Sequence, residues 1–289
     1  MTDPTDLSSA IDALSGANVM VIGDLMLDRF VYGEVERISP EAPVPVIRVG
    51  AEESMLGGAG NVVRNLLALG AEVCFVAVVG DDQIGRDLIE MVAEEERVEP
   101  YLLVERGRRS TTKVRYVAGG QQLLRADRET ERSVDEATQA RIIDIVATEL
   151  EGVSALVLSD YAKGVLTSEV VEALIGAARD AEVPVIVDPK SHDFARYRGA
   201  TVLTPNRREL SLAARMMALA SNIMFLVFDD CSTLPFSRVS ICSPLPPFGT
   251  SSSVTRSGPQ DPLLSKFLPS VHCDALVWKS RIEPSLPTE

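Results

Sequence analysis

Short runs of apolar residues alternate with longer amphipathic segments between residues 19 and 209. The apolar runs are rich in Val and Ile, as in strands buried on both faces, and predict strands at residues 19–22, 73–79, 155–158, 183–187 and 201–203. Helical spacing of apolar residues predicts helices at residues 61–69, 82–95, 135–150 and 168–181, with Gly70 ending the first. This alternation predicts an α/β fold with a mostly parallel sheet covered on both faces.

Two segments depart from the alternation of strands and helices. One, near residues 30–50, is rich in Val and Ile but contains Pro40, Pro43 and Pro45, which suits exposed sheet edges. The other, near residues 111–125, resembles two strands joined by a Gly119-Gly120 turn, a hairpin signal. We therefore expect a small antiparallel lid sheet outside the main layer. Such a lid could cover a ligand or pair with a second subunit in a homodimer.

Polar segments follow each predicted strand of the main sheet. They are Gly23-Asp24 with Asp28, Gly80-Asp81-Asp82, residues 159–164, Asp188-Pro189-Lys190 and Thr204-Pro205-Asn206. In open α/β sheets, ligands bind beyond the carboxyl ends of the strands. Each segment alone could equally be a turn or a helix cap. The presence of five such polar segments at one edge of the sheet favours a ligand site there.

A glycine-rich loop, Gly57-Gly58-Ala59-Gly60-Asn61, stands directly before the first predicted helix. Glycines allow close approach of the backbone, and the exposed amides of a helix N-terminus favour hydroxyl or anionic groups. The loop lacks a convincing buried strand before it, which a dinucleotide fingerprint requires, and the chain has no Walker phosphate loop. By itself the loop is a weak indication of ligand binding.

Composition narrows the classes of function and separates two regions. The net charge of −14 argues against a nucleic-acid or membrane surface. Residues 1–10 hold no basic segment followed by an apolar run, so we expect a cytoplasmic protein. Residues 211–289 contain six acidic and six basic residues, so the whole net charge lies on residues 1–210. We predict an ordered α/β region at 1–210 and an atypical Ser/Pro-rich tail at 211–289.

Several motifs together resemble a known family of enzymes. Gly57, Gly58, Ala59 and Asn61, followed by Gly70 and Gly80, are similar to the first signature of the ribokinase (PfkB) carbohydrate kinases, with Val63 where the family usually has a smaller or hydroxylated residue. Residues 23–29, 37–46, 121–125, 159–164, 188–190 and 197–206 resemble the bacterial D-glycero-β-D-manno-heptose 7-phosphate kinases of ADP-heptose and lipopolysaccharide synthesis. The resemblance covers residues 15–210 and implies a ribokinase-like three-layer α/β/α fold with a lid.

The same resemblance implies transfer of the ATP γ-phosphoryl group to the anomeric hydroxyl of a heptose 7-phosphate, with Mg²⁺ neutralising charge. Such a reaction asks the protein mainly for positioning and electrostatic stabilisation. The implied substrate-binding residues are Asp28, Gly57, Gly58, Asn61, Arg125 and Lys163. The implied nucleotide-binding residues are Lys190, Asn206 and Glu209, and Glu209 has an indirect role toward the metal. Arg125, Lys163 and Lys190 are equally plausible as surface ion-pair residues.

The second signature of that family, Gly-Ala-Gly-Asp, has no counterpart after Leu210. In the family it supplies the catalytic Asp, so we assign no catalytic base and expect very weak turnover or none; losing a general base costs about 100- to 10,000-fold. We interpret residues 211–289 as an out-of-frame or poorly folded replacement of the carboxyl-terminal part of the fold. The alternative functions are a non-catalytic module that binds a sugar phosphate or pairs subunits, and a nucleotide-binding domain of another kind.

Overall fold

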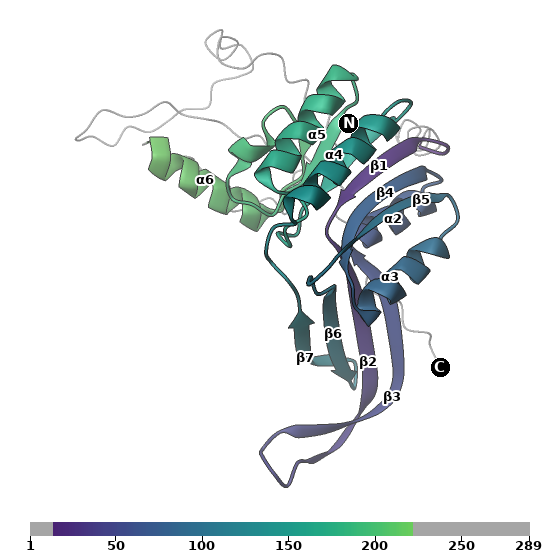
Figure 1. Ribbon diagram of the computed structural model, residues 1–289. Coiled ribbons are helices and arrows are strands. Elements are labelled where there is room, and N and C mark those ends of the chain that lie inside the picture. The colour runs from purple at the N-terminus through teal and green to yellow at the C-terminus, as the bar shows by residue number, and fades with distance from the viewer. Residues whose placement is uncertain (1–13, 222–289) are drawn as a thin grey trace, which may run out of the picture. The chain divides into compact units, whose positions relative to one another are not determined.

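A computed structural model of the chain describes residues 14–221 (Figure 1). The chain divides into two compact units, residues 1–216 and 217–289. The described elements lie in the first unit, apart from the end of the last helix. Most of the predicted tail therefore lies outside the described residues.

The main sheet, sheet A, contains six strands in the part of the chain that the structure describes. They are β1 (Asn18–Gly23), β4 (Glu72–Gly80), β5 (Val98–Glu105), β8 (Ala155–Ser159), β9 (Val185–Asp188) and β10 (Val202–Leu203). Their order is β10-β9-β8-β1-β4-β5, and every pair is parallel. The five predicted strands are confirmed. Strand β5 was not predicted, because Pro100 and flanking acids interrupt its apolar pattern, as an edge strand permits.

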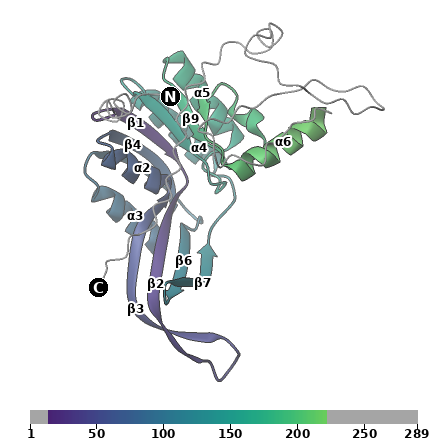
Figure 2. The same ribbon diagram turned by 180° about the vertical axis from the view of Figure 1, so that it is seen from behind.

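Helices cover both faces of sheet A. Helices α2 (Ala59–Ala68) and α3 (Gln83–Ala93) lie on one face, and α4 (Glu136–Glu149) and α5 (Ser168–Asp180) on the other (Figures 1 and 2). Alternate side chains of β1 pack against the two helical layers. Val21 belongs to the hydrophobic core under α2 and α3, and Ile22 belongs to the core under α4 and α5. Burying one such aliphatic side chain stabilises the fold by about 1.5–3 kcal/mol. The predicted three-layer α/β/α architecture is confirmed.

Local sequence signals fix the ends of these helices. Asp82 accepts a hydrogen bond from the backbone N–H of Gly85 at 2.8 Å and caps α3, which gives this acid a structural role. Gly70 adopts φ +90° just after α2, as predicted. Its N–H donates to Leu67 O, and the next N–H, of Ala71, donates to Leu66 O, which ends the helix in a Schellman motif.

The lid, sheet B, has the order β3-β2-β6-β7. It consists of β2 (Leu25–Ile38), β3 (Pro45–Gly58), β6 (Thr111–Ala118) and β7 (Gln121–Arg128). The hairpin at Gly119 and Gly120 is confirmed, with φ of +57° and +74°. The sheet is mixed rather than purely antiparallel, because β6 pairs in parallel with β2 and thereby joins two antiparallel hairpins. Strands β2 and β3 are also longer than predicted. Strand β2 begins one residue after β1, and β3 continues up to the first residue of α2.

The chain continues through a short 3₁₀ helix, η1 (Phe194–Tyr197), and ends its described part in helix α6 (Arg207–Ser221). Helix α6 runs across the predicted boundary at residue 210. No helix within residues 14–221 is long and apolar enough to cross a bilayer.

Candidate functional site

Asp24, the residue between β1 and β2, holds the loop that follows β8. Its carboxylate accepts hydrogen bonds from the backbone N–H groups of Tyr161, Lys163 and Val165 at 2.8, 3.1 and 3.3 Å. The residue is 2% exposed, and burial raises the pKa of its carboxyl group against the opposing effect of these bonds. Asp24 therefore ties the β8 loop to the base of the lid, a role that the sequence did not reveal.

Asp160 fixes the same loop from inside. One carboxylate oxygen accepts from the Ala162 N–H at 2.7 Å, and the other accepts from the Tyr197 hydroxyl at 2.6 Å. Burial and this bond to Asp160 raise the pKa of Tyr197, so its hydroxyl stays protonated. With φ of +57° at Ala162, the loop has a defined, partly strained conformation. Asp160 and Tyr197 therefore hold the β8 loop in place from its buried side.

The glycine loop brings its backbone against the carboxylate of Asp28 and the main-chain carbonyl group of Asp24. A Cβ atom at Gly57 would lie 2.5 Å from Asp28 Oδ2, and one at Gly58 would lie 2.4 Å from the carbonyl oxygen of Asp24. The N–H of Ala59 donates to that same carbonyl at 3.0 Å. Asn61 is exposed in the first turn of α2. The glycines thus allow an approach that no other residue type would permit.

Asp28 is paired with an arginine that sequence reasoning missed. Its Oδ1 lies 2.6 Å from Arg115 Nη1, and both side chains are 20% exposed. The guanidinium group of Arg115 lies over the ring of Phe30 at 5.1 Å, and Phe30 stacks on Tyr32. The alternation of residues 111–118 could have indicated a charged face of the hairpin, but not this partner. Asp28 is therefore held in place while its other oxygen borders Gly57.

Lys163 lies in the β8 loop with its ammonium group between two acids. Its Nζ is 2.9 Å from Glu129 and 3.0 Å from Glu131. Burial alone would lower the pKa of Lys163, but the bonds to Glu129 and Glu131 outweigh that effect and raise it. Glu129 also pairs with Lys113. The charge of Lys163 is thus already neutralised by protein groups.

Arg125 lies in β7 and pairs with a different carboxylate from the two that hold Lys163. Its Nε donates to Asp127 Oδ1 at 2.9 Å, and its side chain is 51% exposed. In the register of the hairpin it stands directly opposite Arg115. The lid therefore presents two neighbouring arginines.

Lys190, Asn206 and Glu209 form one group beyond β9 and β10. Asn206 Oδ1 accepts from the Glu209 N–H at 3.0 Å, and Glu209 Oε2 accepts from the Asn206 N–H at 2.8 Å. This reciprocal capping box accounts structurally for the Asn-x-x-Glu spacing at the start of α6. Lys190 Nζ is 3.6 Å from Glu209 Oε1 and remains 52% exposed. Among the described residues, no three His, Cys, Asp or Glu side chains gather closely enough to hold a metal ion.

Tyr161 connects the two groups of predicted residues. Burial raises the pKa of its hydroxyl to about 12, and the negative charges of Asp188, Asp28, Glu209 and Asp24 contribute further. These acids come from four different segments of the chain, and all of them act on the hydroxyl group of one tyrosine. At the lid, the carboxylate of Asp28 and the backbone of Gly57 and Gly58 can bind hydroxyl groups of a ligand. Near α6, the exposed ammonium group of Lys190 can bind an anion.

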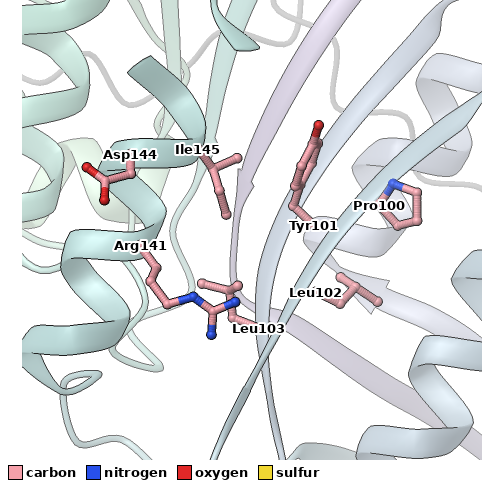
Figure 3. Close-up of a pocket in the computed structure, with 7 residues that line it drawn as sticks. All are labelled: Pro100, Tyr101, Leu102, Leu103, Arg141, Asp144 and Ile145. Atoms are coloured by element: carbon pink, nitrogen blue, oxygen red, sulfur yellow. The ribbon is translucent and has the colours of Figure 1, made fainter. Parts of the chain in front are cut away.

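A separate hollow of about 410 Å³ lies between β5 and α4 (Figure 3). It is lined by residues 100–103, Arg141, Asp144 and Ile145. None of the predicted site residues borders it. We therefore assign the candidate site to the strand ends and the lid.

Known proteins are similar to this chain over most of the part that the structure describes. The model of the pfkB family of carbohydrate kinases matches residues 17–219. The bifunctional protein HldE of Rhodospirillum rubrum is 51% identical over 212 residues, covering 73% of this chain and 43% of that protein. HldE of Acidiphilium cryptum is 54% identical over 211 residues, with the same coverage. The chain thus spans less than half the length of these relatives.

Solved structures share the fold at low sequence identity. A ribokinase of Arabidopsis thaliana complexed with ribose and ATP has a TM-score of 0.50 and 16% identity, covering 69% of this chain and 63% of that one. The tetrameric inhibited form of phosphofructokinase-2 from Escherichia coli has a TM-score of 0.51 and 20% identity, covering 71% and 70%. These likenesses establish the ribokinase-like fold.

Proposed function

Since the chain belongs to the pfkB family of carbohydrate kinases, we propose that its substrate is D-glycero-β-D-manno-heptose 7-phosphate, phosphorylated at the anomeric hydroxyl in ADP-heptose synthesis for lipopolysaccharide. The identity of 51–54% to HldE proteins and the heptose-kinase segments in the sequence support this substrate. The observation that carries the proposal is the Gly57-Gly58 turn packed against Asp28. A cytoplasmic location would suit a reaction that consumes ATP.

On the sugar side, Asp28 and Asn61 are the proposed partners of substrate hydroxyls. Arg115 fixes one oxygen of Asp28, and the other borders the bare backbone of Gly57. A carboxylate that is already held in position accepts hydrogen bonds from sugar hydroxyl groups. Because its charge assists these hydrogen bonds, they are stronger than hydrogen bonds between neutral groups. The Gly57 and Gly58 backbone would let the sugar approach closely.

On the nucleotide side, Lys190, Asn206 and Glu209 are the proposed residues. When bound, ATP with Mg²⁺ supplies the phosphoryl group and neutralises its charge. Mg²⁺ keeps several waters and binds through one or two carboxylates plus phosphates, so a lone Glu209 fits an indirect role. The half-exposed ammonium group of Lys190 fits a phosphate oxygen. In this proposal Asn206 keeps Glu209 oriented through the capping box.

We further propose that turnover is weak. The sequence after Leu210 contains no Gly-x-Gly-Asp segment, and the relation of residues 222–289 to the site lies outside the described part of the chain. The same observation favours one alternative function, a module that binds the sugar phosphate without phosphorylating it. ADP release in the presence of heptose 7-phosphate separates the two.

The test combines calorimetric binding of heptose 7-phosphate with an ADP-release assay on the full chain. Asp28→Asn should weaken sugar binding about ten- to a hundredfold, as expected for loss of a charged hydrogen-bond partner. Asp144→Asn makes the same chemical change in the hollow beside α4 and should leave binding intact. Equal losses in both variants, or no binding by the unaltered chain, would contradict the assignment.

The lid is also the proposed surface of a homodimer. Ile38, Val49 and Leu124 are large apolar side chains of the lid that are at least 48% exposed. Exposed apolar side chains of this size gain free energy when a second subunit removes them from water. Sedimentation velocity should show a dimer that Leu124→Glu dissociates. Leu69→Glu, at the end of α2, should leave it intact, and a monomeric unaltered chain would contradict this role.

A further inference from the structure

The lid carries a charged face on the side of Asp28. Residues directly opposite in neighbouring strands share one face of a sheet. Asp28 stands opposite Lys113, which stands opposite Asp127. The next row of the same face contains Phe30, Arg115 and Arg125. Both arginines therefore lie on the face that includes the proposed sugar-binding carboxylate.

Arg115 and Arg125 carry like charges directly opposite each other in the hairpin, and each is paired with a single carboxylate. Like charges directly opposite in an antiparallel pair destabilise the sheet. Lys113 and Lys163 on this side each contact two carboxylates. In the described part of the chain, the one carboxylate that Arg115 contacts is Asp28, and the one that Arg125 contacts is Asp127. An anion bound between the guanidinium groups would relieve their repulsion.

The free donors of these side chains suit a phosphate group. A guanidinium group has five N–H donors, and each arginine uses one nitrogen in its contact with protein. Planar guanidinium groups bind phosphate through paired hydrogen bonds. The ring of Phe30 beneath Arg115 restricts that side chain before any ligand arrives. The pair is thus partly pre-organised for a ligand with several acceptor oxygens.

We propose that Arg115 and Arg125 bind the phosphate group that the sugar already carries, and so select a phosphorylated sugar over a free one. This inference rests on the proposed function, since it concerns the same sugar site. It gives Arg115 two tasks, orienting Asp28 and binding the phosphate. Lys190, which follows β9, then remains the proposed partner of the nucleotide phosphates.

The test measures binding of heptose 7-phosphate and of unphosphorylated heptose to the full chain by calorimetry without ATP. Arg125→Gln should weaken heptose 7-phosphate about ten- to a hundredfold, as for loss of a charged hydrogen-bond donor, and leave free heptose unchanged. Arg128→Gln removes the same charge from the same strand on the opposite face and should change neither affinity. Arg115→Lys keeps the charge but loses the fork, and should also reduce the preference for the phosphorylated sugar.

The outcomes separate this inference from the proposed function. If the unaltered chain binds both sugars equally, or if Arg125→Gln weakens both to the same extent, the phosphate subsite is wrong while sugar binding stands. If the unaltered chain binds neither sugar, the proposed function fails and the subsite fails with it. Since Arg125 is half exposed, its replacement should preserve the fold, which circular dichroism would check.

Discussion

Replacing Gly58 with Ala tests whether the turn from β3 into α2 depends on glycine. Gly58 has φ +57° and ψ −128°, a region that residues with a Cβ rarely enter. An added Cβ would lie 2.4 Å from the carbonyl oxygen of Asp24 and 2.7 Å from Met26 Cε. The methionine can move, but the carbonyl belongs to buried backbone that also accepts the Ala59 N–H.

Two costs add in this variant. The backbone conformation costs about 1–3 kcal/mol for a residue other than glycine. Overpacking against buried atoms costs a further 1–3 kcal/mol or so. The expected loss of about 2–6 kcal/mol is large beside a typical total stability of about 5–15 kcal/mol.

Urea unfolding followed by circular dichroism measures this loss. With a slope of about 1–3 kcal/mol per molar urea, the midpoint should fall by roughly 1 M or more. Gly176→Ala in α5 is the matched control, because nothing lies within 4 Å of its added Cβ and the helix should gain about 0.5–1 kcal/mol. A Gly58→Ala midpoint within error of the unaltered chain would refute the argument.

Three further predictions concern hydrogen bonds around the site. Asp24→Asn removes one acceptor oxygen and should cost about 1–3 kcal/mol, with faster amide exchange at Tyr161 and Lys163; unchanged exchange would contradict the role of Asp24. Asn206→Ala should cost about 0.5–2 kcal/mol and Asn206→Asp much less, and equal losses in urea unfolding would argue against the capping box. Burial alone would raise the pKa of Glu129, but pairing with Lys163 and Lys113 lowers it below its ordinary 4.5. The ion pairs of Glu129 therefore stabilise the fold above about pH 4.5, and this stabilisation is lost as the pH falls through the folded pKa. Glu129→Gln should therefore be less stable than the unaltered chain at pH 7, and the difference in stability should shrink as the pH falls below about 4.5. A difference that is independent of pH would contradict the ion pairs.

Much of the candidate site could be predicted from short segments. Gly57 and Gly58 were recognisable because adjacent glycines directly before a helix indicate a turn or a close backbone contact, and the structure gives both a steric reason. Asn206 and Glu209 were recognisable by their spacing, but the sequence did not distinguish a ligand-binding motif from the helix cap that the structure contains. Spacing alone specifies a local geometry, and different functions can share that geometry.

The partners of the charged residues could not be predicted. Arg115 and Asp28 are 87 residues apart, and Asp24 and Tyr161 are 137 apart. Lys163 matched a substrate-binding pattern, yet its ammonium group is held by Glu129 and Glu131. Such pairs depend on which strands become neighbours and which side chains lose their water.

The sequence by itself determined the order of the strands and helices apart from β5, the glycine turn of the lid hairpin and the end of α2 at Gly70. These features depend on periodicity and on backbone preferences within a few residues. Only the tertiary structure decided that β6 joins β2 in parallel and that Arg115 stands between Asp28 and Arg125. The physical reason is that strand register and burial arise from contacts between distant segments, which no short stretch of sequence encodes.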